Sequence, residues 1–146
     1  MVIIVGQAIL PGQANNNWSG AIVTVDDTGQ STETDASGHF TIPDVPAGAH
    51  NSISIDAPGY LSAACNAPDL TSAETALTTV TLLSGDVNND DLIDVGDATA
   101  VGTSFGATGS GLIADLNGDA GVDIFDIILV SINYGEKGPQ DWTCLP

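Results

Sequence analysis

The chain has 146 residues and carries 19 acidic side chains against a single Lys or Arg, for a net charge of −18. This balance excludes nucleic-acid binding, which needs Lys and Arg to neutralise phosphates, and it argues against adsorption to an anionic membrane surface. Hydrophobic residues make up 42% of the chain, but no run reaches the about 18 apolar residues of a membrane span. Because charge of one sign opposes a compact state, we expect bound cations to offset it, unless the acidic surface is simply solvated.

The first 84 residues have the pattern of short β-strands. Apolar and polar residues alternate, as in half-buried strands, and clusters of Gly, Pro, Asn and Asp separate the segments. Seven short strands at this spacing predict a small β-sandwich with Phe40 in its core. The predicted strands are VIIVGQAIL (2–10), GAIVTV (20–25), STETD (31–35), GHFTI (38–42), NSISID (51–56), YLSAA (60–64) and TALTTVTLL (75–83).

The strand at residues 2–10 is apolar and lies almost at the start of the chain. Such a terminal strand can pair with the sheet edge of a neighbouring molecule, as in strand addition. The alternative is that it pairs within its own sandwich. The start, MVIIVG, also lacks the basic residues and the cleavage pattern of a signal peptide, so we expect a secreted form to have lost its export signal already.

From Gly85 the pattern changes to a loop followed by a helix, and this unit occurs twice. DVNNDDLIDVGD (86–97) and DLNGDAGVDIFD (115–126) align at an offset of 29 residues, which indicates an internal repeat. Both frames have acidic or amide side chains at the first, third, fifth, ninth and twelfth places. We therefore divide the chain into a β-sandwich domain, residues 1–84, and a small α domain with two loop–helix repeats, residues 85–146.

The spacing within each frame fits calcium, which takes six to eight oxygen ligands and can receive all of them from one twelve-residue loop. Magnesium prefers fewer protein ligands and a rigid octahedral geometry. We expect two Ca²⁺ ions; the alternative is a pair of ordinary Asp/Asn turns that each cap a helix. The expected ligands are the side chains of Asp86, Asn88, Asp90, Asp94 and Asp97 with the Leu92 carbonyl, and those of Asp115, Asn117, Asp119, Asp123 and Asp126 with the Gly121 carbonyl.

The sixth place of each frame departs from the usual calcium loop. That place normally holds Gly, for a sharp turn with positive φ, but here it holds Asp91 and Ala120. Asp tolerates the left-handed conformation, whereas Ala is disfavoured there by roughly 1–2 kcal/mol. We expect Gly121 to absorb the turn in the second loop, which should be atypical or weaker.

Part of the first half resembles a known family. TDASGHFTIPDVPAGAHNSISIDAPGY (34–60) is similar to the signature of carboxypeptidase-regulatory-like domains, which are transthyretin-like sandwiches. The resemblance covers about residues 2–83 and implies a non-catalytic spacer or interaction platform. His50 stands where an aromatic Tyr is usual in this family.

The second half resembles dockerin domains, because each loop ends in Asp and only an exiting helix follows it. The resemblance covers residues 85–142, including the tail GPQDW. Dockerins bind cohesins in extracellular bacterial assemblies, so the resemblance implies a secreted protein and a cohesin-like partner. Residues beside the twelfth ligand would contact that partner or, alternatively, cover the sandwich of the same chain. They are Val95, Gly96 and Ala98 in one repeat and Ile124, Phe125 and Ile127 in the other.

The same resemblance bears on the two cysteines. Dockerin-like folds bring their termini together, which would place Cys144 near the domain junction and within reach of Cys65. A disulfide between Cys65 and Cys144 is one expectation, and two separate thiols are the other.

No residues form a catalytic pattern. The clustered carboxylates are all assigned to the two loops, and His39 and His50 are expected at the surface. We therefore expect a non-catalytic extracellular protein that self-associates into a filament or surface polymer with calcium-stabilised subunits. The alternatives are a docking module for a cohesin-like partner, or a C-terminal fragment of a secreted polysaccharide-degrading enzyme.

Overall fold

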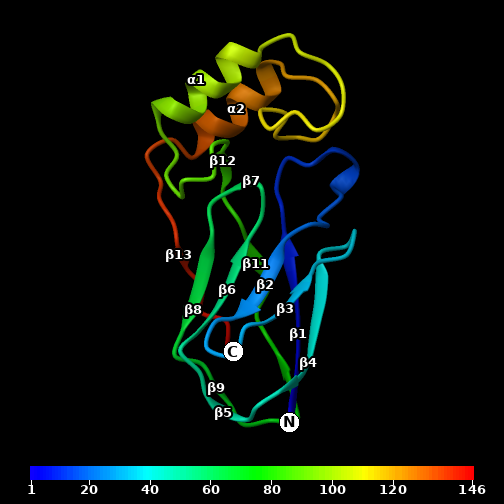
Figure 1. The fold of residues 1–146 in the computed structure, drawn as a ribbon, viewed down its shortest axis with the longest axis vertical. Helices are drawn as coiled ribbons and strands as arrows, with labels where there is room; N and C mark the ends of the chain where they lie inside the picture. The colour runs from blue at the N-terminus through cyan, green and yellow to red at the C-terminus, as the bar shows by residue number, and fades with distance from the viewer.

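A computed structural model describes residues 1–146, with a β-sandwich at one end and two helices at the other (Figure 1). The N-terminus lies at the end far from the helices, and the C-terminus lies back among the strands. The elements are β1 (Val2–Ile9), a 3₁₀ turn (Ala14–Asn16), β2 (Ile22–Val25), β3 (Gln30–Glu33), β4 (His39–Val45), β5 (Gly48–Ala49), β6 (Ser52–Asp56), β7 (Gly59–Tyr60), β8 (Ala63–Asn66), β9 (Asp69–Leu70), β10 (Glu74–Ala76), β11 (Val80–Thr81), β12 (Ser84–Asp86), α1 (Val95–Ser104), α2 (Ile124–Ile132) and β13 (Gln140–Asp141).

Two sheets form the sandwich, as the alternating pattern predicts. One has the order β13-β8-β6-β2-β3, and the other is built on β1 with β4, β10 and β11 as its partners. Short pairs, β12 with β7 and β5 with β9, extend the two ends. Val23 and Val25 on β2 and Ile53 and Ile55 on β6 are fully buried, in register across the two strands, and Phe40 lies in the core as predicted.

Strand β1 is paired along both of its sides. It is antiparallel to β4 and parallel to β10 and then β11. Its backbone groups are thus taken up within its own sandwich. Of the two possibilities for this strand, the structure has pairing within its own sandwich and not strand addition to a neighbouring sheet.

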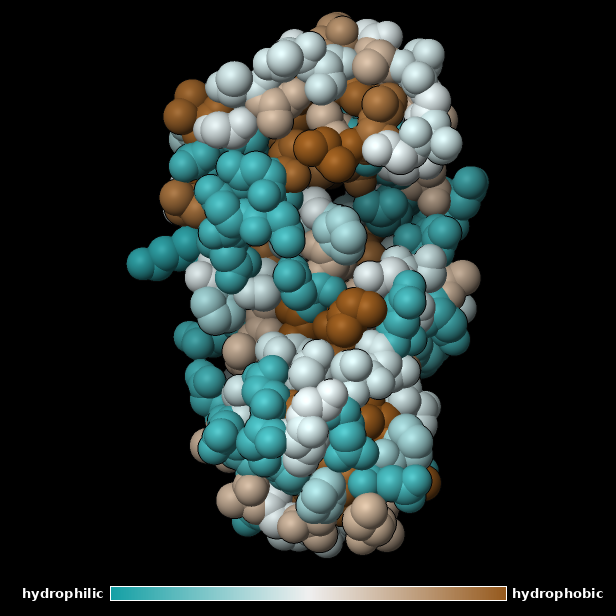
Figure 2. Space-filling model, in the orientation of Figure 1, coloured by the Kyte–Doolittle hydropathy of each residue, from teal (hydrophilic) through white to brown (hydrophobic).

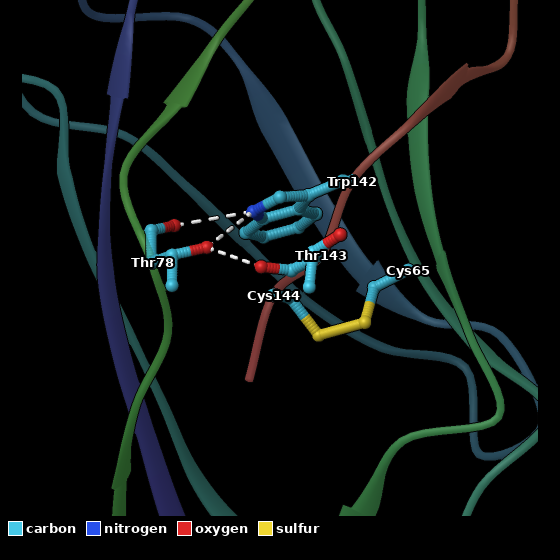
Figure 3. The surroundings of a disulfide bond; sticks show 5 residues. All are labelled: Cys65, Thr78, Trp142, Thr143 and Cys144. Atoms are coloured by element: carbon cyan, nitrogen blue, oxygen red, sulfur yellow. Dashed lines mark hydrogen bonds between the residues drawn. A yellow bond between two sulfur atoms is a disulfide. The ribbon is translucent and has the colours of Figure 1, made fainter. Parts of the chain in front are cut away.

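The last predicted strand, residues 75–83, is split into β10 and β11 around Thr78. The amide of Thr78 donates to the carbonyl of Cys144 instead of to β1, at 2.8 Å. The Thr78 carbonyl and hydroxyl accept from Nε1 of Trp142, at 3.1 and 3.2 Å (Figure 3). The strand is interrupted because the returning C-terminal segment binds there.

This C-terminal segment completes the sandwich. Gln140 and Asp141 form β13 beside β8, and Trp142 and Cys144 are buried in the sandwich core. Cys144 is joined to Cys65 on β8 by a disulfide (Figure 3), so that of the two expectations for the cysteines the bridge is confirmed. The predicted second domain, residues 85–146, therefore does not pack as one unit: its last residues, 140–145, belong to the sandwich.

His50 is buried, with 7% of its surface exposed, whereas His39 is exposed as expected. Its Nδ1 lies 2.9 Å from the Asp27 carboxylate and its Nε2 lies 2.8 Å from the Pro46 carbonyl. Both ring nitrogens thus face acceptors. The surface position expected for His50 is wrong because a polar ring with two partners can be buried where the family has an aromatic one.

A second core of eight buried residues lies beneath the two helices. Val101 of α1 and Val130 of α2 belong to it, together with Leu61, which comes from the turn between β7 and β8. Leu129 of α2 packs against this core and also reaches the loop after β1, since a side chain added at Gly12 would lie 2.6 Å from its Cδ2 atom. Neither helix is long and apolar enough to cross a membrane. We refer below to residues 86–139 as the loop–helix region.

Candidate metal centre

Each acidic frame folds into a loop that ends in a capped helix. Asp94 and Asp123, at the ninth places, have extended backbones and accept from the amides of Gly96 and Phe125. The twelfth-place carboxylate accepts in turn from the amide of the capping residue, which completes a capping box at α1 and at α2. As predicted, no helix enters either loop.

The twelfth-place carboxylates, Asp97 and Asp126, are both 0% exposed. Each has one oxygen that accepts from the amides at the second and third places of its frame and another that accepts from the amide at the ninth place. The distances are 2.8, 3.2 and 2.9 Å in the first frame and 2.8, 3.3 and 2.8 Å in the second. The two frames therefore have the same internal geometry around these ligand positions.

The other expected ligands are arranged by the same kind of bond. First-, third- and fifth-place side-chain oxygens in both frames accept from backbone amides further along the loop. The carbonyl oxygens of Leu92 and Gly121, at the seventh places, accept no hydrogen bond within the chain. The amide bonds are those to Asp86 from Asp90 and Asp91, to Asn88 from Asp90, to Asp90 from Leu92, to Asp115 from Gly118, Asp119 and Ala120, to Asn117 from Asp119, and to Asp119 from Gly121.

Three carboxylates of the first frame converge. Oxygens of Asp86, Asp90 and Asp97 lie within 4.8 Å of one another. Two oxygens bound to one calcium ion at about 2.4 Å can be at most about 4.8 Å apart, so this separation fits a shared ion. The donor set consists of oxygens alone, which also fits this metal.

The electrostatics of the frame favour a bound cation. Burial and the neighbouring charges of Asp97 and Asp90 raise the pKa of Asp86 to about 6, although amide bonds from Asp91 and Asp90 oppose the rise. Burial likewise raises the pKa of Asp126. Apart from His50, no basic side chain forms an ion pair with any carboxylate of the chain. A divalent ion would supply the missing positive charge.

The two frames differ in how closely they gather their ligands. Only the first brings three carboxylate oxygens within 4.8 Å, and its first-place Asp86 is buried while Asp115 is half-buried. Asp91 and Ala120, at the sixth places, both have positive φ, 63° and 69°. Gly121 does not, so the expectation that it would absorb the turn is wrong, and Ala120 itself takes the left-handed conformation.

The eighth-place residues, Ile93 and Val122, are buried in the second core. The backbone of each pairs with the segment that follows the helix of the other repeat. Ile93 bonds to Gly135 and Glu136, and Val122 bonds to Gly106 and Ala107, at 2.8 and 2.9 Å in both cases. The repeats thus interlock with an approximate two-fold relation.

Apolar side chains are exposed over the loop–helix region, which holds nine of the twelve large exposed ones (Figure 2). Phe125 is 60% exposed. Ile124, which precedes it, and Val95, at the corresponding tenth place of the first frame, are exposed as well. The alternative that Phe125 covers the sandwich is therefore wrong. Ala98 and Ile127 lie partly buried against the second core, and Gly96 is exposed. The approach of Leu129 to the loop after β1 at Gly12 is not among the contacts predicted from the sequence.

The sandwich touches both frames through residues that pattern analysis does not single out. Ser62 donates to the Asp91 carboxylate from its amide and its hydroxyl, at 2.8 and 2.6 Å. Gln13 and Ala14 donate to the carbonyls of Leu116 and Asn117, at 2.6 and 2.7 Å. These contacts join single residues far apart in the chain, which produce no periodic signal.

Comparison with known proteins agrees with the first half of this description. A family model described as the carboxypeptidase regulatory-like domain matches residues 9–84. No curated protein sequence matches the chain.

Among solved structures, the chain is similar in fold to chains from two crystal structures of a type II cohesin–X–dockerin complex from Acetivibrio cellulolyticus. One structure carries a C-terminal interface mutant and the other an N-terminal interface mutant. Both have a TM-score of 0.82, with 22% and 21% sequence identity, and both matches cover 94% of this chain and 97% of the other. At this identity the likeness concerns the fold alone.

Proposed function

The chain belongs to the carboxypeptidase regulatory-like domain family through residues 9–84, and from this premise we propose that it is a non-catalytic, calcium-loaded protein-interaction module of the docking kind. The observation that carries the proposal is the equivalence of the two acidic frames. In both frames the first-, third- and fifth-place side-chain oxygens accept bonds from loop amides, the seventh-place carbonyl accepts none, and twelfth-place carboxylates with no exposed surface are held by matched amide bonds.

The proposal assigns one Ca²⁺ to each frame, with the twelve ligand positions predicted from the sequence. Buried carboxylates need paired charge, because an uncompensated buried charge is strongly disfavoured. The chain offers almost no basic side chains for this purpose. The unbonded carbonyls of Leu92 and Gly121 supply the neutral oxygen that a calcium loop uses at its seventh place.

The likeness to chains of a cohesin–X–dockerin complex supports docking. Because the match covers 94% of this chain, it cannot be confined to the sandwich, and it must include most of the loop–helix region. This favours a dockerin-like role for that region. We propose a cohesin-like partner that binds the exposed apolar side chains around Phe125.

The disulfide supports an extracellular location. Cys65 and Cys144 are bonded, and such bridges persist in oxidising compartments. Carboxypeptidase regulatory-like domains are non-catalytic modules, and the proposal assigns the carboxylates that cluster here to calcium binding. We propose that the chain has no catalytic role of its own, whether it works alone or as an appendage of a secreted enzyme.

A self-associating structural subunit is the second candidate. The exposed side chains of Ile128 and Ile132 on α2, next to Phe125, favour it, because such a patch can also pair with another copy. The pairing of β1 on both sides removes the strand-addition route to this assembly.

Light scattering of the full chain in calcium and then in chelator separates the two candidates. Docking predicts a monomer in both conditions, together with calcium-dependent binding to a type II cohesin. That binding should be lost in Phe125→Asp and kept in Phe105→Asp, a matched control because Phe105 is 54% exposed at the end of α1. Large particles that form only with calcium would replace docking by self-association. Cohesin binding that ignores calcium, or equal loss in both variants, would contradict the docking proposal.

A further inference from the structure

The sixth place of the two frames offers a comparison within one molecule. Asp91 and Ala120 share the left-handed backbone conformation. The amide of each donates to the first-place carboxylate, Asp86 or Asp115, at 2.9 and 2.8 Å. The carbonyl of each accepts from a glycine amide, at 2.8 and 2.9 Å. The backbones of these two residues therefore have the same conformation and make equivalent hydrogen bonds in the two loops.

The side chains of Asp91 and Ala120 differ in what they contact. The Asp91 carboxylate leaves the loop and accepts two hydrogen bonds from Ser62 of the sandwich, one from the amide at 2.8 Å and one from the hydroxyl at 2.6 Å. Ser62 follows Leu61, whose side chain is fully buried in the core beneath the helices. Ala120 has only an exposed methyl group.

The surroundings of Asp91 match this role. A Cβ atom at Gly138 would clash with Oδ1 of Asp91, so the carboxylate keeps its place only while residue 138 is glycine. The backbone carbonyl of Asp91 also accepts from the amide of Gly138, on the segment that returns to the sandwich as β13. Asp91 thus joins the loop, the sandwich and the returning segment.

We propose that Asp91 is a positioning residue that fastens the first calcium loop to the sandwich, so that calcium affinity at this loop depends on Ser62. The inference rests on the proposed function. The path is short: Ser62 fixes the Asp91 side chain, and the Asp91 amide fixes the carboxylate of Asp86, the buried first ligand. The second loop has no equivalent path, because its sixth residue has no polar side chain.

The Asp91→Gly substitution tests the proposal by the direction in which it changes the calcium affinity of the first loop. Glycine relieves the strain of the left-handed conformation, so on backbone grounds alone calcium affinity should rise or stay unchanged. If the Ser62 bonds position the ligand, affinity at the first loop should instead fall about tenfold, because two bonds to a charged acceptor outweigh that relief. Ala120→Gly is the matched control, and the second loop should then bind no more weakly than before.

Calcium titrations followed by NMR read the two loops separately, through the amides of Asn89 and Gly118 at their fourth places. We expect Asp91→Gly to weaken only the response of Asn89. Asp91→Asn, which keeps an oxygen for the Ser62 amide, should restore affinity to within about threefold of the parent chain. A Ser62→Ala change should weaken the first loop in the parent chain and have no further effect in Asp91→Gly, because the bond it removes is already gone.

The outcomes separate the inference from the proposed function. If neither amide responds to calcium in the parent chain, both fail. If both respond but Asp91→Gly binds as tightly as the parent, or weakens both loops equally, the inference is overturned while the proposed function stands. Should Asp91→Gly not fold, Ser62→Ala decides alone, and an unchanged first-loop affinity overturns the inference.

Discussion

The core of the sandwich holds 22 buried residues, whereas the core beneath the two helices holds eight. The sandwich also has the disulfide and the buried Trp142, while the loop–helix region exposes nine large apolar side chains and buries the carboxylates of Asp97 and Asp126. One region is stabilised mainly by apolar burial. The other gathers like charges around the proposed ligand positions, so the proposed function predicts that its stability depends on bound calcium.

Removal of calcium should produce the largest contrast between the two regions. Binding at a thousandfold excess over Kd is worth about 4 kcal/mol per site, so two sites supply more than a small core of this size can replace. Chelator should abolish the helical circular dichroism signal of α1 and α2, while tryptophan fluorescence, which comes from Trp18 and Trp142 at the sandwich core, continues to report a folded sandwich. Simultaneous loss of both signals would show that the regions do not differ in this way.

Removal of the disulfide should act on the sandwich instead. A Cys65→Ser, Cys144→Ser double variant opens a loop of about 80 residues and should lower the free energy of unfolding by about 4–5 kcal/mol. Denaturant unfolding followed by tryptophan fluorescence measures this loss of unfolding free energy. Calcium affinity should change much less, because the proposed ligands do not belong to the sandwich core that holds the disulfide. An unchanged unfolding midpoint would contradict this account of the C-terminal segment.

Leu61→Ala tests whether the sandwich contributes to the smaller core. This fully buried side chain lies among the residues beneath the helices, and its truncation should remove about 3 kcal/mol. The loss should appear in the helical signal. Leu70→Ala, a matched control buried in the sandwich core, should lower the stability of the sandwich by a similar amount. Identical effects of the two variants on both signals would show that the cores are not distinct.

His50 should give the smallest effect, confined to the sandwich. Burial lowers its pKa, but the bonds to the Pro46 carbonyl and the Asp27 carboxylate, with the charge of Asp69 nearby, outweigh this and raise the pKa above 6.5. A raised pKa stabilises the fold fully below the unfolded value, and this stabilisation is lost as pH rises through the folded value. Compared with His50→Gln, the parent chain should therefore be more stable at pH 5.5 and lose that advantage by about pH 8.5.

Calorimetric unfolding of the parent chain and His50→Gln over this range measures the difference. A constant difference between the two proteins would show that His50 does not gain a proton on folding. Because His50 directly follows β5, which lies at the end of the sandwich away from the helices (Figure 1), its replacement should leave the chelator response of the helices unchanged.

Local patterns in the sequence predicted most of the longer strands of the sandwich and the position of both helices, whereas the ligand positions of the two frames stay a prediction. Each of these depends on periodicity or on fixed spacing within a dozen residues. The twelfth-place aspartates illustrate why, since their bonds all lie within their own frames.

Contacts between single distant residues were not predictable in the same way. The burial of Trp142 beside Thr78, the split of the last strand and the placement of Leu61 in the second core each depend on where the chain returns in space. The Asp91–Ser62 contact is similar: the sequence showed that Asp91 was unusual at the sixth place but could not show what its side chain meets. The position predicted for His50 was wrong because one of its two acceptors, the Asp27 carboxylate, lies on a distant segment of the chain.

The number of calcium ions bound per chain tests the central claim most directly. Native mass spectrometry of the full chain, after exchange into a calcium-containing volatile buffer, should show two bound ions. Asp97→Ala and Asp126→Ala should each reduce the number to one, and the double variant should bind none. A parent chain that binds no calcium, or that keeps two ions after both substitutions, would contradict the assignment of the two frames as calcium loops.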